Sequence, residues 1–517
     1  MCSHHLTFAG LMFVLSPLLA TAFPSISIQT SGAATCSLTP AHASLLSKNL
    51  TKHLQDSGYA VESAFASWFL PFDSNGPDNP DGTYMEYMFK QSDLPSNFCD
   101  VNFETCFGDI PSSTYTQSTL IGPNDALVFL GCSPPPSSYF ASDLIVSSRF
   151  TKTIDESIPA PDPDDIQMGR DFWFPGVPFN DALNQLKIEN FEWLSPLTMI
   201  QSFNSKTTSD VQKAIKTVSE IDFATGIQQL NSTYVNMYST RATEDFLDAL
   251  PDSFRPLVRW SMPDAPHDGD LVQNYFSQSW PVLVVRGEPE TPDKPKNLFL
   301  TTVTGRVTGK GEQHLNSTVE EGEKRGRTSE ERSDEDVEIE QAWNYLPGEM
   351  ADYVTALQDQ DYGGDYLGTQ DAVYGNPADD DYNNPAELKI NAIAVLTGVM
   401  HTQFGTTTYN NIGVMDTEVV YSQWINNKVL KKCPSTINKD IFQVFFIHAG
   451  ATKDGVNCDG SDTIPSECCF VMDPPEDLYP SDSTYPMLLG ERSYLNPDTK
   501  TGPDFDEIIG VTLTLHH

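Results

Sequence analysis

Short blocks of apolar and aromatic residues, separated by turn residues, dominate the two ends of the chain. Residues 78–89 and 124–131 are rich in aromatic and aliphatic side chains and are bounded by Gly and Asn-Pro turn signals, so both stretches favour strands. Near the C-terminus, residues 390–400 and 441–447 are continuous apolar runs, which is typical of buried strands. We therefore expect a β-rich N-terminal region at 23–155 and a β-rich C-terminal region at 341–517.

The spacing of apolar residues changes in the middle of the chain. Between residues 180 and 260, apolar side chains recur every three or four positions, most clearly over 211–230, and this period predicts helices. Residues 280–286 return to a strand pattern. The region 167–304 is thus predicted to be helical and then extended. Taken together, the patterns favour an α+β, β-rich fold, with antiparallel sheets or a sandwich and a helical middle segment.

Residues 305–340 interrupt these patterns. This stretch is dense in Glu, Arg, Lys, Ser and Gly and has almost no large apolar residue. Such a composition buries too little surface to offset the conformational entropy lost on ordering. We therefore predict a mobile charged insertion. The motif GRVTGKG at its start lacks a Ser or Thr after Lys310 and is one residue short of a phosphate-binding loop.

The N-terminus has the pattern of a targeting sequence. Residues 6–19 are an apolar run, followed by Ala20-Thr21-Ala22, which predicts a signal peptide at 1–22. Residues 23–55 contain no Asp or Glu and are rich in Ser and Thr, a composition typical of a transit peptide. Phe23 directly after the cleavage site resembles the two-part presequence of algae with complex plastids. The apolar spacing of residues 40–55 favours instead an amphipathic helix that begins the fold.

These features predict entry into the secretory pathway, with an extracellular destination and, as the alternative, a complex plastid. No later stretch of the sequence approaches the roughly 18 apolar residues that a transmembrane helix needs. We therefore expect no membrane span.

Cysteine spacing adds a prediction about the compartment. Removal of the signal peptide would take away Cys2 and leave eight cysteines, an even number that suits disulfides in an oxidising environment. They fall into two groups near the two ends of the chain: Cys36, Cys99, Cys106 and Cys132, then Cys433, Cys458, Cys468 and Cys469. Two local disulfide sets are predicted. Three Asn-x-Ser/Thr triplets, at Asn49, Asn231 and Asn316, are compatible with a secreted glycoprotein.

The net charge of the chain limits the classes of molecule that it is expected to bind. It contains 71 Asp and Glu against 30 Lys and Arg, a formal net charge of −41 at pH 7. Nucleic acid and anionic lipid are bound through basic surfaces, so the charge argues against both. Cations or a basic partner are expected instead, although high acidity also serves solubility alone.

One acidic stretch resembles the beginning of a calcium-binding loop. Asp359, Asp361 and Asp365 alternate around a glycine turn, and carboxylates at such spacing are calcium ligands in loops of this kind. Gln370 stands at the twelfth position, where a bidentate Glu would complete the loop. The three aspartates are therefore candidate metal ligands, and an acidic solvated loop is the alternative.

The two C-terminal apolar runs are each followed or ended by a histidine, His401 and His448. Asp416 follows His401 closely in the sequence, and a histidine oriented by a carboxylate is a common general base. His401 and Asp416 are therefore candidate catalytic residues. The alternative is that they are ordinary hydrogen-bonding residues.

Sharper catalytic motifs are absent from the sequence. It contains no G-x-S-x-G, H-E-x-x-H, G-x-G-x-x-G or C-x-x-C pattern. Two functional classes remain: a secreted acidic protein that binds cations, calcium among them, or a partner, and a hydrolase-like enzyme that uses His401 with a nearby carboxylate.

Overall fold

The structure is a computed structural model, and it describes a set of segments between Cys36 and His516. All of them belong to one compact unit, Cys36–His517. The predicted signal peptide and Phe23 lie outside the described residues. The described ranges are 36–68, 82–90, 115–117, 119–150, 172–173, 177–178, 182–230, 253–264, 269–287, 308–309, 311–319, 337–339, 343–347, 372–377, 386–389, 392–415, 422–435, 438–448, 466–473, 484–504 and 507–516.

The first half of the chain forms a 13-stranded sheet. Its main path follows the order β11 (Ala224–Gln229), β10 (Pro196–Ser202), β5 (Ala126–Cys132), β13 (Trp280–Arg286), β1 (Ala60–Trp68), β2 (Gly82–Lys90), β12 (Ser253–Pro263), β6 (Ser137–Phe150) and β7 (Phe172–Trp173). Four short strands pair beside this path: β3 (Tyr115–Thr116), β4 (Thr119–Leu120), β8 (Val177–Pro178) and β9 (Leu183–Asn184). Strand β9 pairs with β6, and a bridge between Glu189 and Thr225 returns to β11, so the sheet is nearly closed like a barrel.

Strand β5 is buried at every position because both faces of the sheet are covered there. Successive side chains of a strand point to opposite faces. Leu127 and Phe129 accordingly belong to one core cluster, and Val128 and Leu130 belong to another on the opposite face. A strand buried on both faces reads as a continuous apolar run, and the strand predicted in this part of the sequence is confirmed.

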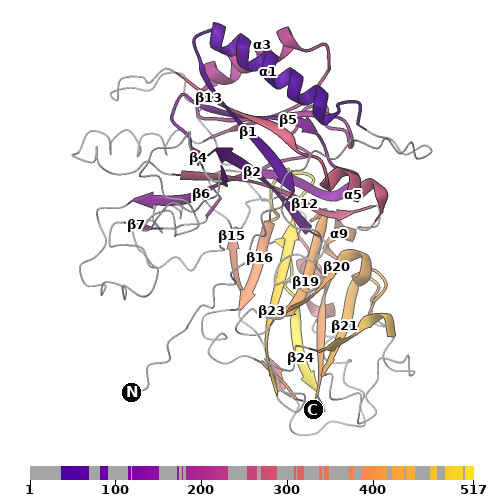
Figure 1. The fold of residues 1–517 in the computed structure, drawn as a ribbon. Helices are drawn as coiled ribbons and strands as arrows, with labels where there is room; N and C mark the ends of the chain where they lie inside the picture. Colours follow the sequence, from indigo (N-terminus) through magenta and orange to yellow (C-terminus); the bar gives the residue numbers. More distant parts are fainter. Residues whose placement is uncertain are drawn as a thin grey trace. The chain divides into compact units, whose positions relative to one another are not determined.

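Two helices cover one face of this sheet. Helix α1 (Pro40–Asp56) begins at Thr39, whose hydroxyl accepts a hydrogen bond from the His42 amide, and Pro40 fits the first turn. Helix α3 (Ser205–Val218) begins at Asn204, whose side chain accepts from two backbone amides. Figure 1 shows α1 and α3 side by side over the sheet. Their buried leucine, valine and isoleucine side chains share a cluster with β5 and β13. A further helix is α5 (Asp270–Phe276).

The middle of the chain is less helical than its apolar spacing predicts. Helix α3 is present, but residues 224–229, which continue the same spacing, form β11 and pair in parallel with β10. The replacement of helix by strand follows from tertiary pairing, which overrides local preference. The packing around this strand is close at Gly226, where a Cβ atom would lie 2.7 Å from the Leu183 side chain. Residues 231–252 of the stretch with helical spacing lie outside the described residues.

The second half of the chain contains two further sheets. The five-stranded sheet has the order β14 (Val337–Ile339), β24 (Thr512–His516), β18 (Ile393–Val399), β21 (Ile441–His448) and β22 (Cys469–Met472). The six-stranded sheet has the path β15 (Trp343–Pro347), β16 (Ala372–Pro377), β23 (Tyr485–Tyr494), β19 (Tyr409–Met415) and β20 (Ser422–Asn426), and β17 (Ala386–Leu388) pairs with β23. Short helical turns accompany them: η3 (Gln313–Leu315), α9 (His401–Phe404), α10 (Asn427–Leu430) and η5 (Ser466–Cys468).

These two sheets contribute to one hydrophobic core. Leu396, Val444 and Leu513 come from the five-stranded sheet, and Ile412 and Leu489 come from the six-stranded sheet. The two apolar runs at 390–400 and 441–447 contain strands β18 and β21 of this core. The molecule as a whole is a β-rich α+β protein. The 13-stranded and five-stranded sheets are mixed, because β10–β11 and β21–β22 are parallel pairs among otherwise antiparallel neighbours.

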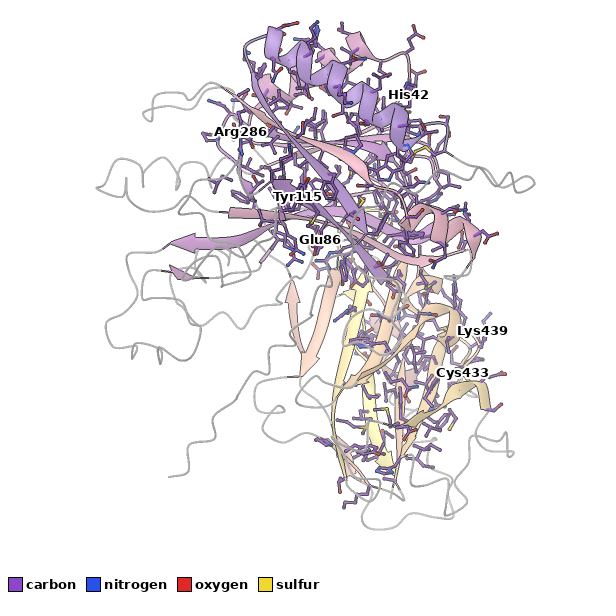
Figure 2. The ribbon with its side chains drawn as sticks, in the orientation of Figure 1. His42, Glu86, Tyr115, Arg286, Cys433 and Lys439 are labelled. Carbon is purple, nitrogen blue, oxygen red and sulfur yellow. A yellow bond between two sulfur atoms is a disulfide. The ribbon has the colours of Figure 1, made fainter. Side chains whose placement is uncertain are left out.

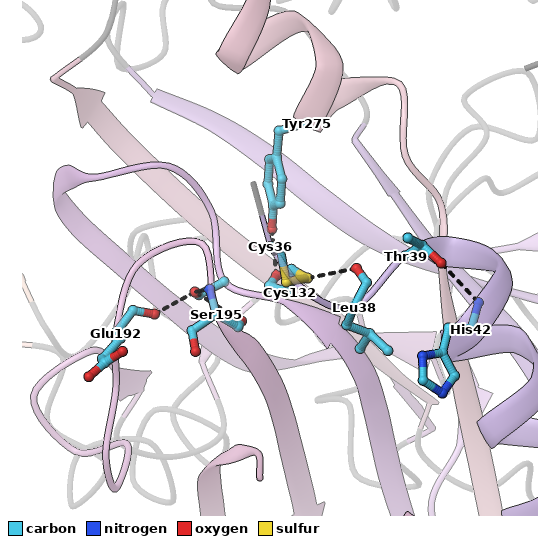
Figure 3. The surroundings of a disulfide bond; sticks show 9 residues. Cys36, Leu38, Thr39, His42, Cys132, Glu192, Ser195 and Tyr275 are labelled. Carbon is cyan, nitrogen blue, oxygen red and sulfur yellow. Dashed lines mark hydrogen bonds between the residues drawn. A yellow bond between two sulfur atoms is a disulfide. The ribbon is translucent and has the colours of Figure 1, made fainter. Parts of the chain in front are cut away.

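Disulfides join cysteines within each of the two groups. Cys36 is bonded to Cys132, which ties the residues before α1 to the end of β5 (Figure 3). The hydroxyl of Tyr275 in α5 donates to the Cys132 carbonyl at 2.8 Å. Cys433 is bonded to Cys468, and Cys469 is also disulfide-bonded. Both described pairs are local to their end of the chain, as the spacing predicts, and they are compatible with an oxidising compartment.

Candidate functional site

His401 lies at the end of a core strand, where the sequence places it. Strand β18 ends at Val399, and the single turn α9 begins at His401. The backbone amide of Met400 donates to the Asp440 carbonyl at 3.0 Å, which fixes the chain direction at this point. Gly405, with φ of 71°, ends the turn in the left-handed conformation that glycine adopts without strain.

Two carboxylates hold the His401 ring. Its Nδ1 lies 2.7 Å from Glu312 Oε2, and its Nε2 lies 2.7 Å from Glu491 Oε1. The exposed fractions are 0% for His401, 0% for Glu312 and 1% for Glu491. We refer to these three residues as the Glu–His–Glu triad. It is a fully buried ion cluster in which both ring nitrogens are engaged.

Glu491 reaches the triad from the core face of β23. Alternate residues of this strand, Tyr485, Met487 and Leu489, are buried in the shared core. Since side chains alternate along a strand, Glu491 is carried on that same face. The sequence contains this signal: a carboxylate at a core-facing position of an apolar strand requires a buried partner. Sequence reasoning did not single out Glu491.

Glu312 comes from the stretch that was expected to be a mobile charged insertion. The structure describes residues 308–309 and 311–319 of that stretch, and there Glu312 immediately precedes η3. Leu315 and Val319 are buried against Val399 and Ile441. The charged composition of this segment predicts exposure to solvent. The charge of Glu312 is instead balanced inside the protein by His401. The remaining residues of 305–340, apart from 337–339, lie outside the described part of the chain.

Further hydrogen bonds satisfy the carboxylate oxygens of the triad. The Thr406 hydroxyl donates to Glu312 Oε1 at 2.5 Å, and the Ile509 amide donates to Glu312 Oε2 at 3.4 Å. The Val511 amide donates to Glu491 Oε2 at 3.1 Å. Buried carboxylates are tolerated only when they are paired and hydrogen-bonded in this way.

The electrostatics of the triad favour an imidazolium. Burial alone would lower the pKa of His401, but the charge and hydrogen bond of Glu312, together with those of Glu491, raise it to about 10. Burial likewise would raise the pKa of Glu312, but the charge and hydrogen bond of His401, with the Thr406 hydrogen bond, hold that pKa below its ordinary value. At neutral pH both ring N–H groups therefore donate to carboxylates.

This arrangement limits the chemistry of His401. A general base needs a nitrogen lone pair within reach of a substrate proton, whereas both nitrogens here face glutamates and the side chain has no exposed surface. The predicted helper Asp416 lies outside the described residues, so its position relative to His401 is not given. Catalysis by His401 with Asp416 stays a prediction. The other histidine of this pattern, His448, is buried and stacked on Tyr485.

The candidate calcium ligands Asp359, Asp361 and Asp365 also lie outside the described residues, and a calcium site there stays a prediction. Within the segments that the structure does describe, no group of three or more His, Cys, Asp or Glu side chains is arranged to hold a metal ion.

Other carboxylates in the first half of the chain, buried or partly buried, have arginine partners. Arg286 contacts Glu62 Oε2 at 2.9 Å and Asp125 Oδ2 at 2.7 Å. Arg259 contacts Asp143 Oδ2 at 2.9 Å. Arg255 forms an ion pair with Glu86. Figure 2 labels Arg286 and Glu86 on the strands that carry them.

Two polar side chains beside the triad have no internal partner. Asn410 of β19 and Ser493 of β23 are directly opposite each other in the antiparallel register, so their side chains are neighbours on one face. Ser493 lies on the same face of β23 as Glu491. Asn410 is 1% exposed and Ser493 is 0% exposed. Neither the Asn410 amide nor the Ser493 hydroxyl has a hydrogen-bond partner in this structure.

Comparison with known proteins gives no functional assignment. No protein-family model matches the chain, and none of the curated proteins matches it. A solved structure that aligns with this chain is the crystal structure of an uncharacterized protein from Burkholderia cenocepacia, with 10% sequence identity and a TM-score of 0.35. The alignment covers 92% of this chain and 87% of that chain. A similarity at this score carries no argument about function.

Among the helices that the structure describes, none has the length and apolar character needed to cross a membrane.

Proposed function

We propose that this protein is a secreted, acidic, non-catalytic protein that binds cations, calcium among them, or a basic partner through its surface. The observation that carries the proposal is the formal net charge of −41 at pH 7. A surface of this sign attracts cations and basic surfaces over distances of about a Debye length, ~8–10 Å at physiological salt.

The placement of the internal charges supports the proposal. The buried carboxylates of the triad share the His401 imidazolium, and those of Glu86 and Asp143 have arginine partners. Each of these cations is therefore balanced by carboxylates inside the fold. The excess of negative charge is carried by other residues of the chain, and charged residues are mostly exposed in folded proteins.

The geometry of His401 favours this class over a hydrolase-like enzyme. An imidazolium that donates to two buried carboxylates has no nitrogen left for proton transfer. We therefore assign His401 a structural role within the proposal. The triad then joins the segment at 311–319 to the α9 turn and to β23.

Calcium is the most specific cation that the sequence suggests. Asp359, Asp361 and Asp365 supply carboxylate oxygens at alternating positions beside a glycine turn, and calcium takes oxygen ligands of this kind in flexible geometries. A cation bound only by the folded protein raises its stability as its concentration rises above the dissociation constant.

The test is a calcium titration of thermal stability. We expect CaCl₂ to raise the thermal midpoint saturably at constant ionic strength, and to do so more than MgCl₂, because calcium accepts irregular oxygen geometry. Stabilisation would reach about 2.7 kcal/mol when calcium is present at 100 times its dissociation constant. The triple variant Asp359→Asn, Asp361→Asn, Asp365→Asn should lose the response.

A matched control removes the same charge elsewhere. Asp56, Glu220 and Asp222 are exposed, and the triple variant with Asn, Gln and Asn at these positions should keep the calcium response. A midpoint that ignores calcium in the unmodified protein, or that responds equally in both triple variants, would contradict a calcium site at Asp359, Asp361 and Asp365.

A further inference from the structure

The Glu312 carboxylate is surrounded by the donor set of an anion site. The His401 ring N–H and the Ile509 amide donate to its Oε2, and the Thr406 hydroxyl donates to its Oε1. A cationic donor, a hydroxyl and a backbone amide together bind carboxylates by charge-assisted hydrogen bonds. Here the bound carboxylate belongs to the protein itself.

The segment that carries Glu312 contributes little else to the triad. We call residues 308–309 and 311–319 the strap. Its first residues are held by Glu507, whose carboxylate accepts hydrogen bonds from the Thr308 amide and hydroxyl at 2.8 Å and 2.7 Å and from the Gly309 amide. Its last residues pack through Leu315 and Val319. Between these two anchors, Glu312 is the residue of the strap that enters the triad.

The other residues of the site come from elements outside the strap. His401 and Thr406 belong to the α9 turn and the residues after it, and Ile509 belongs to the segment before β24. The strap is therefore not needed to build the donor set, and it supplies only the anion. Asn410 and Ser493, which lack partners beside Glu491, add unused polar groups to the same region. Buried polar groups of this kind usually hydrogen-bond to water or to a ligand.

We propose that His401, Thr406 and the Ile509 amide form a carboxylate-binding site, that Glu312 is its internal ligand, and that a small monocarboxylate occupies the site when the Glu312 side chain is withdrawn. This inference does not depend on the cation-binding function proposed above. On this proposal, the strap fills a site whose donors all belong to other segments of the fold.

The geometry selects a monocarboxylate among anions. The two oxygens of Glu312 are used separately, one on the ring and amide and the other on the hydroxyl, which matches a planar carboxylate. Glu491 lies on the opposite side of the ring, and its negative charge disfavours a dianion such as phosphate. Chloride is a single acceptor atom, whereas the donors of this site address two separate oxygens.

Acetate is the probe, used with the full-length variant Glu312→Ala. This substitution removes the heavy atoms of acetate, Cγ, Cδ and the two oxygens, and leaves Cβ in place. At neutral pH we expect the variant to melt below the unmodified protein in sodium chloride. Sodium acetate at equal ionic strength should raise its midpoint saturably, by about 2 °C or more once acetate is well above its dissociation constant.

Three control proteins define the result. The unmodified protein and Glu312→Gln keep the site filled and should show no acetate-specific rise. Adding Thr406→Ala to Glu312→Ala removes one donor and should weaken the acetate response severalfold. The proposal is overturned if acetate and chloride act alike on Glu312→Ala, or if acetate stabilises all four proteins equally.

A refolding experiment covers the case in which Glu312→Ala does not fold in chloride. The denatured variant is then refolded in acetate and in chloride, and the yield of folded protein is measured by size exclusion and circular dichroism. A higher yield in acetate supports the site, and equally low yields overturn it. Gln313→Ala, an exposed neighbour in the strap, should refold equally in both salts.

Discussion

At the scale of single residues, His401 is the cation of a fully buried cluster. Its ring holds two carboxylates that are both almost completely buried. A buried charge pair contributes little net stability compared with apolar residues, but removal of one partner leaves the other charge uncompensated. The triad is therefore a point at which one substitution has a large effect.

We expect His401→Gln to destabilise the protein by about 3–5 kcal/mol at neutral pH, because Glu312 and Glu491 would then be buried without a cation. Urea unfolding followed by fluorescence would measure the change. His314→Gln is the matched control, because His314 lies in the strap but is exposed. A loss in the control as large as in His401→Gln would argue against the triad as the cause.

The same residue gives the protein an alkaline pH dependence. The pKa of His401 is raised from 6.5 to about 10, so the folded state binds this proton more tightly than the unfolded state. Its stabilisation is complete below about pH 6.5 and is lost progressively as the pH rises toward 10. For Glu312, whose pKa is lowered, the contribution is present above its ordinary pKa and is lost as the pH falls below it.

The measurement of this effect is the free energy of unfolding between about pH 6.5 and 9, below the range in which tyrosines titrate. The unmodified protein should lose stability across this window, and His401→Gln should lose much less because it lacks the titrating group. Parallel slopes in the two proteins would show that another group is responsible.

At the scale of elements, helix α1 is attached to the large sheet by a narrow apolar face. Leu46, Leu50 and Leu54 recur every four residues and are buried, whereas Leu45 is 57% exposed. Residues four apart lie on one side of a helix. The disulfide between Cys36 and Cys132 fixes the chain just before this helix.

This helix offers a comparison of two identical substitutions. Leu50→Ala should cost about 2–5 kcal/mol, because Leu50 is fully buried against β5 and β13 and its loss leaves a cavity. Leu45→Ala should change the free energy of unfolding by no more than about 0.5 kcal/mol. Chemical denaturation of both variants measures the difference. Equal effects would mean that α1 does not pack through this face.

Elements differ in how far local pattern determines them. Strands β5 and β21 are buried almost throughout, and their unbroken apolar runs identify them without knowledge of their partners. Strand β11 is the opposite case. Its residues continue a helical spacing, and they form a strand because β10 lies alongside and Leu183 and Ile188 pack closely at Gly226.

At the scale of the whole molecule, the net charge of −41 acts against compactness. Like charges on a folded surface repel one another, and this repulsion is relieved when the chain expands. Arg255, Arg259 and Arg286 are each paired with carboxylates inside the fold, so they do not offset the excess of negative charge elsewhere.

Salt should therefore stabilise this protein. We expect the thermal midpoint to rise as NaCl is increased from about 0.01 M to about 0.5 M, because the Debye length falls from about 30 Å to less than 10 Å and surface repulsion is screened. Scanning calorimetry at fixed pH measures the rise. A midpoint that falls with salt would indicate that attractive surface ion pairs outweigh repulsion. The calcium titration needs constant ionic strength for the same reason.

Features that depend only on neighbouring residues can be predicted from the sequence alone. Continuous apolar runs identified core strands, four-residue spacing identified α1, and the grouping of cysteines indicated local disulfides. The partners of His401 depended on the tertiary structure, because Glu312 and Glu491 lie 89 and 90 residues away along the chain. No local pattern connects such positions, and a glutamate in a charged stretch resembles a solvent-exposed one until the fold encloses it. The sequence shows which residues carry charge. Only the packing of distant segments decides which of those charges are buried together.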